Sequence, residues 1–85
     1  MNPADEAELG KRHYREMSVA NIRDRVGADY LEVVFLESAR FFRLSRHSPA
    51  FHDICKLLRE ALKNGSVLKV GLASPESDVI EEIMA

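Results

Sequence analysis

The chain has 85 residues, a formal net charge of −2, 46% hydrophobic residues and 31% charged residues. This length provides one domain with a thin core, and the apolar content argues against disorder of the whole chain. The single cysteine excludes an internal disulfide, and no apolar run is long enough to span a bilayer. The acidic first ten residues lack the pattern of a secretory signal, so we expect a cytoplasmic protein that does not bind a membrane.

Residues 1–17 are predicted to form an N-terminal helix or a mobile tail, followed by a single α+β domain over residues 18–85. Glu8 precedes Arg12 by four positions, which favours an ion pair on a helix. Gly10 weakens the middle of this segment, and its apolar residues make a poor stripe. The sequence therefore leaves the helix and the tail as alternatives.

Three segments that alternate between apolar and polar residues follow, over 18–25, 30–36 and 39–45. In the first segment Ala20 and Ile22 are expected to share the inward face. The inward residues of the other two segments are predicted to be Leu31, Val33, Phe35, Phe42 and Leu44. Because short connections usually join neighbouring strands, these segments are predicted to form an antiparallel meander.

A helix is predicted from Pro49 to about Asn64. Ser48 is the expected N-cap, Pro49 suits the first helical position, and Gly65 suits the left-handed position after the last turn. Apolar residues recur at helical spacing at Phe51, Ile54, Cys55, Leu58, Ala61 and Leu62. This stripe is expected to pack on one face of the sheet, with Leu58 at its centre.

The C-terminal part begins with a strand over 66–73, whose inward residues are expected to be Leu68, Val70 and Leu72. Residues 75–84 fit either a second helix or a turn followed by a strand over 79–83, and we prefer the strand because it covers an exposed edge. The predicted fold is α+β, an antiparallel meander sheet of four to five strands with one main helix packed on one face, in the order β-β-β-α-β-β. This order is compatible with an oligonucleotide-binding barrel, and equally with an open or partly closed sheet, which we favour because the strands are short.

Side chains that carry chemistry do not form a recognisable site. His47, His52 and Cys55 match no common zinc spacing, and Cys55 belongs to the apolar stripe of the predicted helix. No glycine-rich phosphate loop is present. We therefore expect no catalytic activity, no metal site and no cofactor.

The most distinctive pattern is a strand in which aromatic residues and arginines alternate, over residues 39–46. Together with the neighbouring strand it provides the candidate binding residues, which are Tyr30, Val34, Arg40, Phe41, Arg43 and Arg46. Arginine is common at interfaces and forms bidentate contacts with phosphates and carboxylates, and aromatic rings can stack on bases.

Two functions follow as hypotheses. The first is a non-catalytic interaction module that binds a protein partner, or a second copy of itself as a homodimer, through this face of the sheet. The alternative is binding of single-stranded nucleic acid through residues 39–46. The overall acidic charge disfavours the second hypothesis.

Overall fold

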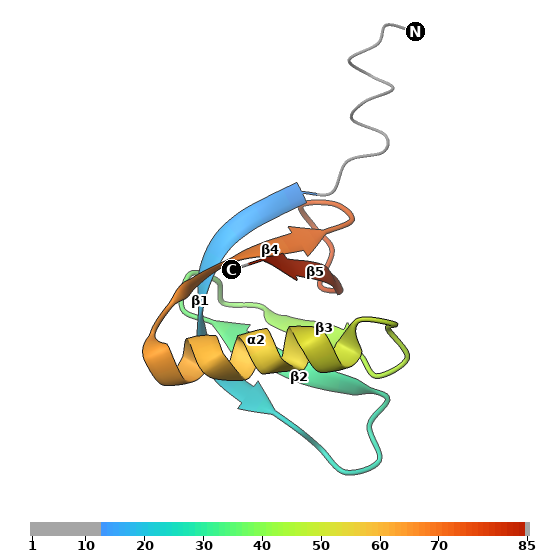
Figure 1. Cartoon of the computed structure of the whole chain (residues 1–85). Helices are drawn as coiled ribbons and strands as arrows, with labels where there is room; N and C mark the ends of the chain where they lie inside the picture. Colours follow the sequence, from blue (N-terminus) through green and yellow to red (C-terminus); the bar gives the residue numbers. More distant parts are fainter. Residues whose placement is uncertain (1–12, 85) are drawn as a thin grey trace, which may run out of the picture.

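The structure, a computed structural model, describes residues 13–84 (Figure 1). Its elements are β1 (His13–Arg23), β2 (Tyr30–Phe35), β3 (Phe41–Ser45), α2 (Phe51–Asn64), β4 (Val67–Leu72) and β5 (Ile80–Met84). The order of these elements confirms the α+β class predicted from the sequence. The ambiguous C-terminal segment forms a strand, because Ile80 and Ile83 alternate with polar residues and reach the core.

The five strands form one antiparallel sheet in the order β3-β2-β1-β4-β5. Strand β1 is long and serves two neighbours. Its first half pairs with β4 from His13 to Ser18, and its second half pairs with β2 from Val19 to Arg23. The predicted meander therefore comprises β1, β2 and β3, whereas β4 joins on the other side of β1.

The sheet curls until its two outermost strands meet. Arg43 of β3 forms a parallel bridge with Val79, just before β5, and the Arg43 N–H donates to the Asp78 carbonyl at 2.8 Å. The result is a partly closed five-stranded barrel with a helix between the third and fourth strands, an architecture shared with oligonucleotide-binding barrels. Since one architecture can carry unrelated functions, the barrel alone does not define a function.

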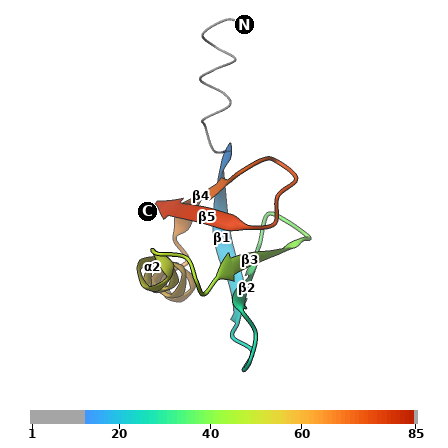
Figure 2. The same ribbon diagram turned by 90° about the vertical axis from the view of Figure 1, so that its right-hand side faces the viewer.

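Helix α2 lies beside the curled sheet (Figure 2). The core comprises the inward side chains of the sheet and those on the side of α2 that packs against them. Its buried apolar residues are Met17, Val19, Leu31, Val33, Phe35, Phe42, Leu44, Ile54, Leu58, Ala61, Leu68, Val70, Leu72, Ile80 and Ile83. The rings of Phe35 and Phe42 meet edge to face with their centroids 5.3 Å apart, a favoured aromatic geometry. The inward faces predicted for β2, β3 and β4 are confirmed.

Two features of β1 differ from the sequence prediction. The strand begins at His13, so residues 13–17 are strand, although they were assigned to the N-terminal helix or tail; residues 1–12 lie outside the described residues. The pairing with β2 also shifts between Val19 and Asn21. This bulge places Val19 in the core and leaves Ala20 exposed, because an extra residue reverses the alternation of faces.

Helix α2 starts later than its sequence indicated. The residue that precedes it is Ala50 and no side chain caps it, because Ser48 and Pro49 form a turn in which the Ser48 carbonyl accepts from Phe51 N–H at 3.0 Å. The C-terminal prediction is confirmed, since Gly65 has φ of 69° and donates to the Ala61 carbonyl at 2.7 Å.

Candidate functional site

Four of the six candidate residues lie together on the side of the sheet that faces away from the core. Val34 pairs with Phe41, and Tyr30 pairs with Ser45, so alternate residues of β2 and β3 form a continuous surface. The exposed fractions are 37% for Tyr30 and 52% for Phe41. Tyr30, Val34, Phe41 and Arg43 are called the outer face below.

Arginines already cover the two exposed rings of the outer face. The guanidinium carbon of Arg43 lies 5.6 Å from the Tyr30 ring centroid, and that of Arg23 lies 5.4 Å from the Phe41 ring centroid. Such cation–π contacts stabilise by about 0.5–1 kcal/mol at exposed sites. A platform for stacked bases needs open rings, so these contacts argue against the predicted nucleic-acid surface.

Glu32 lies on the same side of the sheet but is only 8% exposed. It pairs across the strands with Arg23 and Arg43, and its carboxylate lies 3.6 Å from Arg23 and 4.0 Å from Arg25. This carboxylate offsets part of the positive charge of the surrounding guanidinium groups. The sequence analysis missed its role because the cross-strand register, which places it among arginines, is not visible in local alternation.

Arg40 does not belong to the outer face. Its guanidinium donates to the carbonyls of Glu76 at 2.9 Å and Pro75 at 3.1 Å, and it pairs with Asp78 at 3.1 Å. These contacts hold the connection between β4 and β5 against the connection between β2 and β3. Arg40 therefore helps to close the barrel.

Arg46 is also engaged elsewhere. Its Nε donates to the Ala28 carbonyl at 2.8 Å, and its guanidinium pairs with Asp24. Asp24 in turn lies 3.7 Å from Arg59 of α2. Arg46 thus ties the loop between β1 and β2 to the end of β3 and to the helix.

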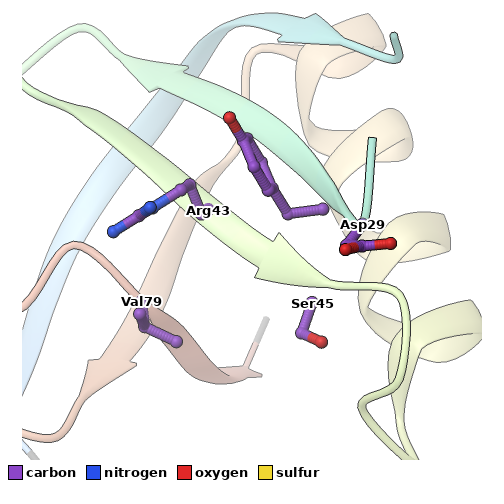
Figure 3. Close-up of a pocket in the computed structure, with 5 residues that line it drawn as sticks. Asp29, Arg43, Ser45 and Val79 are labelled. Carbon is purple, nitrogen blue, oxygen red and sulfur yellow. The ribbon is translucent and has the colours of Figure 1, made fainter. Parts of the chain in front are cut away.

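A shallow depression of about 260 Å³ lies at one end of the outer face (Figure 3). Its lining residues come from the end of the β1–β2 loop, from β2, from β3 and from the position just before β5; they are Asp29, Tyr30, Arg43, Ser45 and Val79. The sequence analysis found Tyr30 and Arg43 but not the other three, because only closure of the barrel brings them together.

The groups that were considered for metal binding or nucleophilic chemistry remain apart. Cys55 is half-buried on α2, and burial raises the pKa of its thiol, despite the opposing effect of Arg59 and Arg46. A thiol with a raised pKa is a poor nucleophile at neutral pH. Within residues 13–84, no three His, Cys, Asp or Glu side chains are placed to share a metal ion, and no helix is long and apolar enough to cross a membrane.

The sequence matches no family model and no curated protein, but the fold resembles part of two solved structures. Crystal structures of pro-protein-glutaminase and of one of its mutants superpose with TM-scores of 0.76 and 0.72, at 21% and 20% sequence identity. The superposition covers 89% and 88% of this chain, but only 26% and 25% of the other two. The chain thus spans about a quarter of the length of these structures, and the likeness establishes the fold.

These comparisons contradict the function predicted from the sequence. The prediction was a non-catalytic interaction module acting through the sheet face, with single-stranded nucleic-acid binding as the alternative. The same fold occurs within the precursor of an enzyme. The packing gives a physical reason as well: Arg43 contacts the Tyr30 ring, and Arg40 and Arg46 contact carbonyls and carboxylates of their own chain.

Proposed function

We propose that this chain is the part of an enzyme precursor that regulates a catalytic domain of the protein-glutaminase kind. Unlike the module predicted from the sequence, this part belongs to an enzyme, and its role does not depend on the outer face. The observation that carries the proposal is the superposition of almost the whole chain on about a quarter of a proenzyme. A proenzyme consists of a catalytic part and a part that keeps it inactive. A segment of this size, with its own core and a partly closed barrel, fits the second role.

The chemistry of the chain supports placing the catalytic residues elsewhere. Hydrolysis of a glutamine side chain, which the name protein-glutaminase describes, requires an activated nucleophile close to a base. Cys55 has a raised pKa and lies on the side of α2 that packs on the core. We therefore propose that the catalytic groups belong to the partner domain, either on the same polypeptide or on another chain.

Two measurements test the proposal. The first is release of ammonia from a glutamine-containing peptide by the chain alone, and we expect none above the uncatalysed rate. The second adds increasing amounts of the chain to mature protein-glutaminase, and we expect a saturable fall in the rate of ammonia release.

An unrelated acidic protein of similar size is the control in the second measurement and should leave the rate unchanged. Release of ammonia by the chain alone would contradict the placement of the catalytic groups. An unchanged rate of the mature enzyme at a large excess of the chain would contradict the regulatory role. The cytoplasmic location expected from the sequence stays a prediction.

A further inference from the structure

The depression beside the outer face carries opposite charges at its two sides. Figure 3 shows Arg43 and Val79 on one side, and Asp29 and Ser45 on the other. Within the described residues, no carboxylate lies within ion-pair distance of Arg43, and no basic group lies within that distance of the Asp29 carboxylate. Both residues are exposed. The contact of Arg43 with the Tyr30 ring uses the flat face of its guanidinium and leaves its N–H groups available to a ligand.

The strand geometry sets the separation of the two backbone positions that carry these charges. The N–H of Arg46 donates to the Asp29 carbonyl at 2.9 Å, so Asp29 lies opposite Arg46. Arg43 lies three residues earlier on the same segment, and strands rise by about 3.3 Å per residue. The two backbone positions are therefore roughly 10 Å apart. Figure 3 shows the guanidinium end of Arg43 pointing away from Asp29, and the two side chains form no ion pair. A ligand that contacts both charged groups must therefore be extended.

The floor between the charges is mainly apolar. Tyr30 and Val79 both line it, and the Arg43 guanidinium covers one face of the Tyr30 ring. The Ser45 hydroxyl accepts a hydrogen bond from His47 N–H at 3.1 Å and can still donate. The volume of about 260 Å³ lies just below that of pockets for drug-sized ligands. The depression thus suits a short alkyl chain.

We propose that this depression binds a small linear zwitterion, in which an ammonium group and a carboxylate are separated by a short alkyl chain. The Arg43 guanidinium donates to the ligand carboxylate, and the Asp29 carboxylate accepts from the ammonium group. The alkyl chain lies against Tyr30 and Val79. An α-amino acid fits less well, because its two charges are on neighbouring groups and cannot reach both ends.

The test uses ligands of equal chain length and different charge. Amide resonances of the full chain are followed by NMR during titration with 6-aminohexanoate, hexanoate, hexylamine and glycine. We expect saturable shifts at Asp29, Tyr30, Arg43, Ser45 and Val79 with 6-aminohexanoate. Because both charged residues are exposed, loss of either ligand charge should weaken binding by about two- to fivefold.

Two variants assign the charges. Asp29→Asn should reduce the affinity for 6-aminohexanoate to that for hexanoate and leave the affinity for hexanoate unchanged. Arg43→Gln should reduce the affinity for 6-aminohexanoate to that for hexylamine. Glu60→Gln and Lys69→Gln change the same types of charge at exposed positions outside the depression, and should leave all affinities unchanged.

Several results would overturn the proposal. These are an absence of saturable shifts at ligand concentrations on the order of 10 mM, shifts confined to other residues, and equal affinities for hexanoate and 6-aminohexanoate. Equal effects of the control variants and the two site variants would overturn it as well. The amide spectra of the variants also report whether each one keeps the fold.

Discussion

Truncation of Leu58 tests the contact between α2 and the barrel. Leu58 has an exposed fraction of 0% and lies on the helix between the buried residues Ile54 and Ala61. Leu58→Ala removes its branched end and leaves a cavity that the surrounding strands fill only in part. Such substitutions cost about 2–5 kcal/mol in the free energy of unfolding. Since small domains are stable by about 5–15 kcal/mol, this is a large share of the total.

The matched control is Leu62→Ala, the same chemical change on the same helix. Leu62 is 41% exposed, although the sequence placed it in the apolar stripe with Leu58. We expect a cost below about 1 kcal/mol in the free energy of unfolding, because Leu62 buries less apolar area on folding than Leu58 does. Urea denaturation followed by circular dichroism measures both variants, and the midpoint should shift without a change in the slope of the unfolding free energy.

Equal losses of stability in the two variants would refute the assignment of Leu58 to the centre of the core. If Leu58→Ala does not fold, Leu58→Met keeps the comparison measurable. That substitution nearly conserves volume and should cost less than about 1.5 kcal/mol.

Two further predictions concern β1. Gly71→Ala should destabilise by about 1 kcal/mol, because the added carbon would lie 3.0 Å from the Tyr14 ring and 3.2 Å from Glu82 Cβ. The cost stays small because the exposed Tyr14 ring can shift. Thermal unfolding should show a smaller cost in a Tyr14→Ala background, and an equal cost would contradict the crowding. The Ser18 N–H donates to Glu37 Oε1 at 2.7 Å and lowers the pKa of this carboxyl below 4.5. A carboxyl whose pKa is lower in the folded state than in the unfolded state stabilises the fold at pH values above its ordinary pKa. This stabilisation is lost as the pH falls through the pKa of the folded state. Unfolding of Glu37→Gln should therefore show a deficit at neutral pH that disappears well below pH 4.5, and a deficit independent of pH would contradict this assignment.

Much of the local structure could be predicted from the residues. Alternation in β2 identified Leu31, Val33 and Phe35 as inward, and all three are buried. The end of α2 at Gly65 also followed from local chemistry, since a left-handed backbone there favours glycine. The outward orientation of Ala20 in β1 did not follow from local chemistry, because the pairing of β1 with β2 places a bulge there.

The candidate site could be predicted only in part. Tyr30, Phe41 and Arg43 share a face because residues two apart on a strand point the same way. Arg40 and Arg46 lie beside them in the sequence but fall in connections, where side-chain direction follows no period. Both guanidinium groups donate hydrogen bonds to backbone carbonyls in loops of their own chain.

The sequence by itself determined the α+β class, the order of the elements, and which side chains of β2, β3 and β4 face inward. These properties depend on local periodicity and turn chemistry. The tertiary structure alone decided that β4 pairs with β1, that β3 meets β5, and that Asp29, Ser45 and Val79 join Tyr30 and Arg43 around one depression. Local periodicity reports which face of a strand is apolar, whereas the choice of a pairing partner depends on the free energy of the whole curled sheet.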